Sequence, residues 1–165
     1  MSKFLNNYWY VAANSEELKD KPIARIILGN PIVLFRGKSG KIGALDDRCA
    51  HRLTPLSLGR IDGDQLECGY HGWTYDCAGK CVRLPGLETP QKITVKSFPL
   101  VEKWGWVFIW MGDPDKADNN TLPDFHVMGE DKWVGDGGML RVEAHCDLIR
   151  DNLLDLTHAK YTHKQ

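Results

Sequence analysis

The sequence predicts a mainly β protein, in which a small β-sandwich domain is followed by the start of an α+β domain. Three observations predict this fold class. Short runs rich in Ile, Val and aromatic residues alternate with turn residues over the first two-thirds of the chain. A polar, turn-rich stretch follows at residues 112–120, and a helical pattern of apolar residues begins at Asp147. We therefore expect one domain at residues 1–115 and the beginning of a second at residues 116–165.

The expected elements follow one another in short steps. Residues 14–18 predict a short helical turn, because Asn14 is a favourable N-cap residue and acidic residues follow it. Gly29 and Asn30 separate two apolar runs, and residues 37–41 predict a hairpin turn. The alternation at residues 139–146 predicts one more strand. The runs that predict the earlier strands are residues 8–12, 25–28, 31–36, 42–45, 95–101 and 105–111.

The composition is that of an ordinary globular protein. The chain has 165 residues, of which 42% are hydrophobic and 26% are charged, and its net charge is −1. This balance gives no sign of a nucleic-acid or membrane surface. No apolar run is long enough to span a membrane, and the N-terminus lacks the apolar core of a signal peptide. We therefore expect a cytoplasmic protein that binds neither nucleic acid nor membrane.

Two Cys-then-His arms are the most informative motif. Cys49-Ala-His51 is the first arm, and Cys68-Gly-Tyr-His71 is the second. A [2Fe–2S] cluster in which two histidines replace two cysteines on one iron needs this mixture of ligands. A structural zinc site is the alternative, but zinc motifs usually pair Cys with Cys and His with His. The spacing therefore favours the iron–sulfur cluster, with each arm giving one ligand to each iron.

The two arms closely resemble the Rieske motif of ring-hydroxylating and demethylating oxygenases. The resemblance extends to Arg52 after the first arm and to Gly72-Trp73 after the second, where Trp73 is expected to shield the cluster. It implies that the first domain is a Rieske [2Fe–2S] domain. The chain has three further cysteines, and a cytosolic location argues against disulfides among Cys77, Cys81 and Cys146.

A second group of candidate ligands lies near the C-terminal end of the sequence. Asp155 and His158 are three residues apart and would be neighbours on one helix face. His158 and His163 would lie about 140° apart on an ideal helix, so both can bind one metal only if the helix ends or deforms between them. Taken alone, this pattern is also compatible with a pair of surface histidines.

The segment from Asp151 to His163 resembles the start of the catalytic domain of Rieske non-haem iron oxygenases, most closely the vanillate and dicamba O-demethylases. The resemblance implies that His158 and His163 are ligands of a mononuclear Fe(II) with a 2-His-1-carboxylate triad. Asn152 would lie near the iron. Asp155 would be a bridging carboxylate that links His158 to the cluster ligand His71 of a neighbouring subunit in a homotrimer.

The resemblance also implies the activity and its partners. The protein would be a terminal oxygenase component that takes electrons from a reductase or ferredoxin and activates O₂ for an aromatic substrate, with a vanillate-like aryl methyl ether favoured. Hydroxylation of a methyl group on an aromatic sulfonate or carboxylate is the second choice. The third iron ligand is expected beyond Gln165, so the chain is expected to be truncated and inactive alone. A Rieske-type ferredoxin, which carries electrons without catalysis, is the alternative function.

Overall fold

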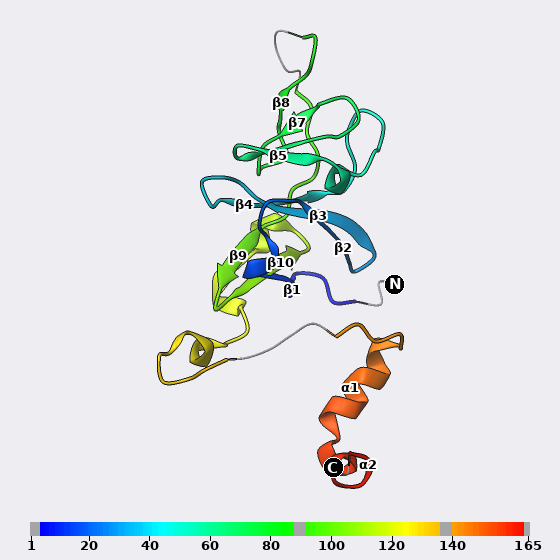
Figure 1. Cartoon of the computed structure of the whole chain (residues 1–165), viewed down its shortest axis with the longest axis vertical. Coiled ribbons are helices and arrows are strands. Elements are labelled where there is room, and N and C mark those ends of the chain that lie inside the picture. Colours follow the sequence, from blue (N-terminus) through cyan, green and yellow to red (C-terminus); the bar gives the residue numbers. More distant parts are fainter. Residues whose placement is uncertain (1–3, 88–91, 136–139, 164–165) are drawn as a thin grey trace. The chain divides into compact units, whose positions relative to one another are not determined.

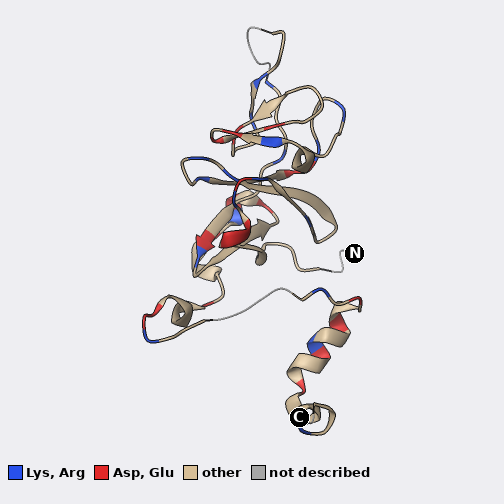
Figure 2. Cartoon of the chain, viewed as in Figure 1, with Lys and Arg blue, Asp and Glu red and all other residues tan. Residues whose placement is uncertain are grey.

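The computed structural model of the chain describes residues 4–87, 92–135 and 140–163. The chain divides into two compact units, residues 1–133 and 134–165. The contacts place residues 116–133 with the first unit, and the domain boundary after residue 115 stays a prediction. Basic and acidic side chains are interspersed in both units, in keeping with a net charge near zero (Figure 2).

The first unit is built from three antiparallel sheets, so the expectation of a mainly β fold is confirmed (Figure 1). Asn14 caps the short helical turn η1 (Ser15–Glu17) with a reciprocal capping box, as expected from the sequence. In order within each sheet, the strands are β1 (Tyr8–Asn14), β10 (Trp106–Met111) and β9 (Leu100–Lys103); β2 (Ile23–Ile27), β3 (Asn30–Arg36) and β4 (Ile42–Asp46); and β5 (Arg60–Asp62), β6 (Gln65–Glu67), β7 (Thr74–Tyr75) and β8 (Cys81–Arg83).

Strand β3 is the centre of the first unit, because both of its faces are buried. Ile32 and Leu34 point into a core shared with β1 and β10. Val33 and Phe35 point the opposite way, into a second core beneath the β5–β8 sheet. All four side chains have no exposed surface, which follows from the period-2 alternation of a strand that is covered on both sides. The β2–β4 sheet therefore separates the β5–β8 sheet from the β1–β10–β9 sheet.

The strand expected at residues 95–101 is only partly present. Strand β9 begins at Leu100, while the preceding residues run beside β4. The N–H of Asp46 donates to the carbonyl of Lys96 at 2.8 Å, and the N–H of Phe98 donates to the carbonyl of Ala44 at 3.0 Å. This segment joins the sheets to one another through single backbone hydrogen bonds outside a regular ladder.

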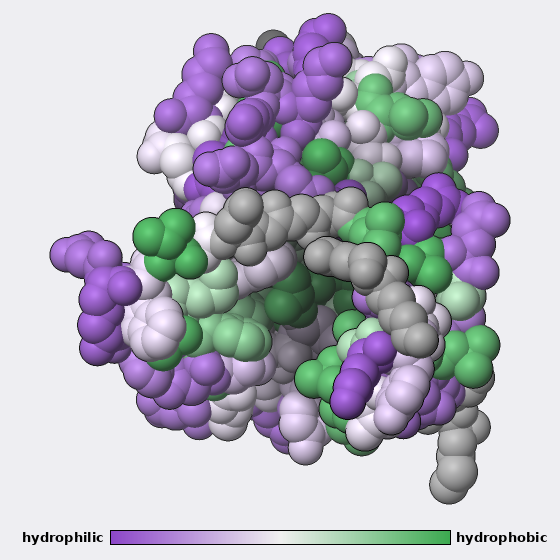
Figure 3. All heavy atoms as spheres, turned by 60° about the horizontal axis from the view of Figure 1, so that its bottom comes forward, coloured by the Kyte–Doolittle hydropathy of each residue, from purple (hydrophilic) through white to green (hydrophobic). Residues whose placement is uncertain are grey.

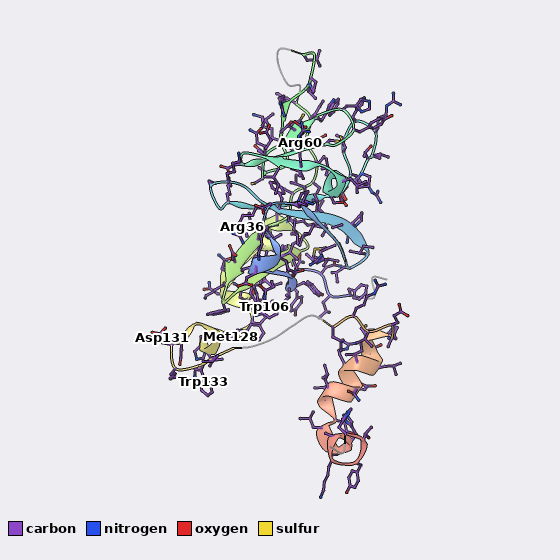
Figure 4. The ribbon with its side chains drawn as sticks, viewed as in Figure 1. Arg36, Arg60, Trp106, Met128, Asp131 and Trp133 are labelled. Atoms are coloured by element: carbon purple, nitrogen blue, oxygen red, sulfur yellow. The ribbon has the colours of Figure 1, made fainter. Side chains whose placement is uncertain are left out.

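The outer face of β1 and β10 carries an aromatic core of Trp9, Phe108 and Trp110. Residues after β10 cover it through three short helices, η3 (Pro114–Lys116), η4 (Asn119–Thr121) and η5 (His126–Gly129). The indole N–H of Trp9 donates to the carbonyl of Asp118 at 2.9 Å and so attaches the segment after β10 to strand β1. Figure 4 shows Met128, Asp131 and Trp133 around η5. The side chain of Trp133 is 60% exposed. Figure 3 shows, more generally, that apolar residues, in green, lie at the surface among hydrophilic ones.

The second unit consists of helices α1 (Cys146–Leu154), η6 (Leu156–His158) and α2 (Ala159–Thr162). The strand expected at residues 139–146 is wrong for the described part, residues 140–146; Met139 lies outside the described residues. Residues 140–145 pair with no strand in the described part of the chain, and Cys146 already begins α1 because His145 caps it. No helix among the described residues is long and apolar enough to cross a membrane.

Candidate metal centre

The first ligand arm, residues 49–53, is a tight loop after β4. The N–H of Cys49 donates to the carbonyl of Thr54 at 2.9 Å, and the N–H of Leu53 donates to the carbonyl of Cys49 at 2.8 Å. Leu53 adopts a left-handed conformation with φ of 55°, which is unusual for a leucine. The carboxylate of Asp47, just before the loop, accepts hydrogen bonds from the N–H and the hydroxyl of Ser57, just after it, at 2.7 and 2.6 Å. His51 is therefore presented at the tip of a loop closed by backbone hydrogen bonds.

The second ligand arm, residues 68–73, connects β6 to β7 and is closed in the same way. The N–H of Cys68 donates to the carbonyl of Trp73 at 2.8 Å, and the N–H of Gly72 donates to the carbonyl of Cys68 at 3.0 Å. Gly72 has φ of 70°, and a Cβ added there would lie 3.0 Å from Cγ of Pro85. A glycine is needed at this turn because other residues rarely adopt that conformation.

The fold brings the four sequence-predicted ligands together. The thiols of Cys49 and Cys68 are in contact and almost fully buried, with exposed fractions of 2% and 1%. The imidazoles of His51 and His71 lie side by side, with 4.4 Å between their ring centres. The thiols are thus on the inner side and the imidazoles nearer the surface, and the two residue types needed for a cluster with a Cys-bound and a His-bound iron are grouped separately.

The electrostatics of this group fit a bound metal cluster. Burial raises the pKa of the Cys68 thiol, and the adjacent Cys49 raises it further, while the backbone N–H groups of Tyr70 and His71 act in the opposite direction. Burial lowers the pKa of His51, and the neighbouring His71 and Arg52 add to this effect. Nδ1 of His51 is buried and has no hydrogen-bond partner. A buried, unsatisfied ring nitrogen beside two crowded thiols is the donor set that a metal would satisfy.

The alternative of a single zinc ion agrees less well with the geometry. A tetrahedral zinc site holds its ligand atoms within about 4 Å of one another. In the described part of the chain, the three donor atoms that all lie within 4.8 Å of one another belong to His145, Cys146 and Asp147, and no three of the four arm ligands form such a group. By this distance, the arm ligands do not form the compact set of donor atoms that one zinc ion needs.

Two supporting contacts were not expected from the sequence. Tyr75 is fully buried, and its hydroxyl oxygen accepts from the N–H of Ala50 at 3.1 Å and lies 3.3 Å from Sγ of Cys49. Burial raises its pKa, and the nearby Cys49 raises it further. The carboxylate of Glu67, beside Cys68, is buried between Arg60 and Arg83 (Arg60 is labelled in Figure 4). No sequence pattern indicates the contact between Tyr75 and Cys49, because β7 has two residues and both are buried.

The second group of candidate ligands lies where α1 ends. The rings of His158 and His163 are 5.5 Å apart between centres and inclined at 68°. Two imidazoles that share one metal place their ring centres roughly 5 Å apart, since each metal–nitrogen bond is about 2.1 Å. The chain reaches this arrangement because α1 ends at Leu154 and a short 3-10 turn precedes α2. The interruption offsets the 140° separation of an ideal helix.

The contacts of His158 define which nitrogen is available. Its Nδ1 lies within hydrogen-bond distance of the backbone carbonyl of Asp155, so Nδ1 carries the proton in the neutral ring. Its Nε2 lies 3.3 Å from the side-chain nitrogen of Asn152 and therefore has its lone pair facing that amide. Nε2 is thus the ligand atom that this arrangement presents, with Asn152 beside it.

The hydrogen bonds of the Asp155 carboxylate within the described residues go to Thr157 and not to the ring of His158. This carboxylate accepts hydrogen bonds from the hydroxyl and the N–H of Thr157. Both hydrogen bonds lower the pKa of Asp155, and the one from the hydroxyl makes the larger contribution. The ring of His158 is held by the carbonyl of Asp155 instead, a contact that sequence spacing cannot distinguish from one through the carboxylate. The close group of His145, Cys146 and Asp147 is explained by helix capping, because Nδ1 of His145 accepts from the N–H of Asp147 at 3.3 Å.

Comparison with known families gives two matches. Residues 8–99 match the family described as the Rieske [2Fe–2S] domain. Residues 142–165 match the vanillate O-demethylase oxygenase C-terminal domain. The first match contains both ligand arms, and the second contains His158 and His163.

Similar proteins include several oxygenase components. The chain is 42% identical over 163 residues to the dicamba O-demethylase oxygenase component of Stenotrophomonas maltophilia, covering 98% of this chain and 48% of that protein. It is 43% identical over 160 residues to a putative toluene-4-sulfonate monooxygenase iron–sulfur subunit of Comamonas testosteroni, covering 96% of this chain and 46% of the other. A crystal structure of dicamba monooxygenase bound to dicamba superposes with a TM-score of 0.91 at 42% identity, over 97% of this chain and 48% of that one. The chain thus spans about half the length of these relatives.

Proposed function

The chain belongs to the Rieske [2Fe–2S] domain family, and on this premise we propose that it supplies the electron-carrying domain and part of the iron site of a terminal oxygenase component. The observation that carries the proposal is the convergence of the two arms, with two buried thiols on the inner side and two adjacent imidazoles nearer the surface. The match of residues 142–165 to an oxygenase C-terminal domain supports the second part.

In this proposal, Cys49 and Cys68 hold one iron of the cluster, and His51 and His71 hold the other. The bound cluster supplies a one-electron carrier. The protein's part is to keep the thiols dry and to satisfy their negative charge. The hydroxyl of Tyr75 and the N–H groups of Tyr70 and His71 are the donors that face the two sulfurs.

His158 and His163 are the proposed imidazole ligands of a mononuclear Fe(II), and the third, carboxylate ligand of such a site stays unassigned. The carbonyl of Asp155 holds the ring of His158 through Nδ1, which leaves Nε2, beside Asn152, available to the iron. We retain the bridging role of Asp155 towards the partner subunit's His71 as part of the proposal, in a homotrimer. In that assembly the carboxylate would leave Thr157 or share its hydrogen bonds.

The substrate class in this proposal is an aromatic acid with a methoxy or methyl group. For an aryl methyl ether, one oxygen atom of O₂ enters the O-methyl carbon and the other leaves as water, with two electrons from a reductase or ferredoxin and two protons. The hemiacetal formed then collapses to a phenol and formaldehyde. The relative from Comamonas testosteroni is named for toluene-4-sulfonate, and its likeness supports methyl hydroxylation as the second choice.

Iron binding outside the cluster distinguishes an oxygenase fragment from an electron carrier. Cluster-loaded protein would be dialysed against Fe(II) without O₂, beside the double variant His158→Ala/His163→Ala. We expect additional Fe(II) to bind to the parent chain and this binding to be lost in the double variant, while the cluster spectrum is unchanged. Equal Fe(II) binding by both proteins would contradict the iron site and favour a Rieske-type ferredoxin.

A further inference from the structure

Four rings from the two ligand arms form one continuous row. The indole of Trp73 is stacked on the imidazole of His51, with 4.6 Å between centres and 5° between planes. The ring centres of His51 and His71 are 4.4 Å apart, and those of His71 and Tyr70 are 3.8 Å apart. The row runs from a half-buried tryptophan to a tyrosine that is 64% exposed. The two imidazoles that the proposed function assigns to the cluster are thus enclosed between two aromatic side chains.

We propose that Trp73 and Tyr70 are positioning residues that set the orientation of the imidazole ligands, Trp73 for His51 and Tyr70 for His71. The inference rests on the proposed function, since it assumes that the two imidazoles are ligands. It goes further by assigning each ligand a separate aromatic partner. Both partners belong to the second arm, so Trp73 ties the ligand of the first arm to the backbone of the second.

Trp73 is suited to this role because it is anchored, while no protein group among the described residues forms a hydrogen bond with Nδ1 of His51. Trp73 packs against the core beneath the arms, and its carbonyl accepts from the N–H of Cys68. Thr74, directly after it, is fully buried at the start of β7. Nδ1 of His51 makes no hydrogen bond and is the nitrogen that the iron would engage in the proposed function. One bond to iron would leave the ring free to turn about that bond, so stacking on the indole fixes the plane of the imidazole. A near-parallel contact also keeps water from one face of the ring.

The side chain of Tyr70 can be replaced to remove its contact with the ring of His71 without disturbing the fold of the loop. Its backbone lies between two glycines whose surroundings leave no room for a side chain, because a Cβ at Gly69 would meet the carbonyl of Leu58 at 2.9 Å and one at Gly72 would meet Pro85. The phenol is mostly exposed, so its removal takes little apolar surface out of the core. Its contact with His71 is therefore open to a test in which the loop itself keeps its shape.

The proposal predicts an asymmetry that simple loop stability would not produce. Cluster-loaded chains carrying Trp73→Leu, Trp73→Phe, Tyr70→Leu or Tyr70→Phe would be reduced and examined by pulsed EPR, which resolves the nitrogen couplings of the two iron-bound imidazoles. We expect Trp73→Leu to shift one coupling and Tyr70→Leu to shift the other. The two Phe variants retain a ring and should return the couplings to those of the parent chain.

Exposed aromatic residues outside the arms provide matched controls. Tyr8→Leu and Trp133→Leu remove side chains that are 55% and 60% exposed, and both should leave the two couplings unchanged. Parent-like couplings in both Trp73→Leu and Tyr70→Leu would overturn the positioning role alone. Loss of the cluster in both Trp73→Leu and Trp73→Phe would show that Trp73 stabilises the loop instead of orienting His51. A parent chain without any iron-bound imidazole would contradict the proposed function itself.

Discussion

The hydroxyl oxygen of Tyr75 lies 3.3 Å from Sγ of Cys49, and both groups are buried. The same oxygen accepts from the N–H of Ala50. When Cys49 is a thiolate, as the proposed function requires, the hydroxyl is the donor in its contact with the sulfur. Tyr75 comes from β7 and Cys49 from the loop after β4, so the contact connects the β5–β8 sheet to the first ligand arm. A donor in this position stabilises negative charge on the sulfur.

Tyr75→Phe should lower the reduction potential of the bound cluster while leaving the fold intact. The reduced cluster carries more negative charge than the oxidised one, so the hydrogen bond favours reduction. If the two states differ by about 1 kcal/mol in hydrogen-bond strength, the potential falls by roughly 40 mV. A redox titration followed by EPR measures this change. An unchanged potential in a variant with full cluster content would show that the hydroxyl does not donate to Cys49.

Gly72→Ala should destabilise the second arm more than Gly63→Ala destabilises the β5–β6 turn. Both glycines have positive φ, 70° and 62°, so each substitution introduces strain of about 1 kcal/mol. Only the Cβ at Gly72 would meet a neighbour, Cγ of Pro85 at 3.0 Å, while the space beside Gly63 is open. Urea unfolding and cluster content after gel filtration compare the two variants. Equal stability and equal cluster content would contradict the close approach at Pro85.

Leu66→Ala should cost about 2–5 kcal/mol of unfolding free energy. Leu66 is fully buried in the core beneath both arms, together with Cys49, Cys68 and Tyr75. Leu58→Ala is the matched control, because Leu58 is 73% exposed near the same arms and its removal should change stability by no more than about 0.5 kcal/mol. Chemical unfolding of both variants tests this contrast, and similar losses would contradict the burial of Leu66 in this core.

The pair of Arg36 and Glu102 should make stability depend on pH in the acidic range. Arg36 on β3 donates to both carboxylate oxygens of Glu102 on β9, at 2.9 and 2.6 Å (Arg36 is labelled in Figure 4). Hydrogen bonding to Arg36 lowers the pKa of Glu102 below its ordinary value of 4.5. The folded state therefore binds this proton less readily than the unfolded chain. The stabilisation is present above the ordinary pKa and is lost as the pH falls through the lowered one.

Glu102→Gln isolates this effect from the other carboxylates. Because both side chains are partly exposed, we expect the parent chain to be more stable than the variant by only about 1 kcal/mol at pH 7. The difference should vanish as the pH falls below the lowered pKa. Thermal or urea unfolding of both proteins between pH 7 and pH 3 gives the measurement. A difference that grows on acidification would have the wrong sign for this pair.

The sequence predicts the Rieske domain and the central strands well, because both depend on local patterns. The Cys-x-His and Cys-x-x-His spacings identify the arms, and β3 is evident as an apolar run between turn residues. The short strands β5, β7 and β8 are harder to find, since two or three residues carry no periodicity and their pairing depends on the arms they support.

The errors have a common physical origin in tertiary contacts. The expected strand at residues 139–146 has the right alternation, but a strand needs a partner, and His145 instead caps a helix. For Asp155, whose bridging role stays a prediction, spacing alone does not reveal that the hydroxyl of Thr157 donates to its carboxylate. Buried Glu67 with its two arginines could not be foreseen, because Arg60 and Arg83 come from different strands.

The most direct test of the account is metal and sulfide analysis of the purified chain, made together with EPR of the dithionite-reduced protein. The account predicts about two irons and two acid-labile sulfides per chain, with an EPR signal that is lost in Cys68→Ala. Colourless protein that contains one zinc per chain, bound through Cys49, His51, Cys68 and His71, would contradict it.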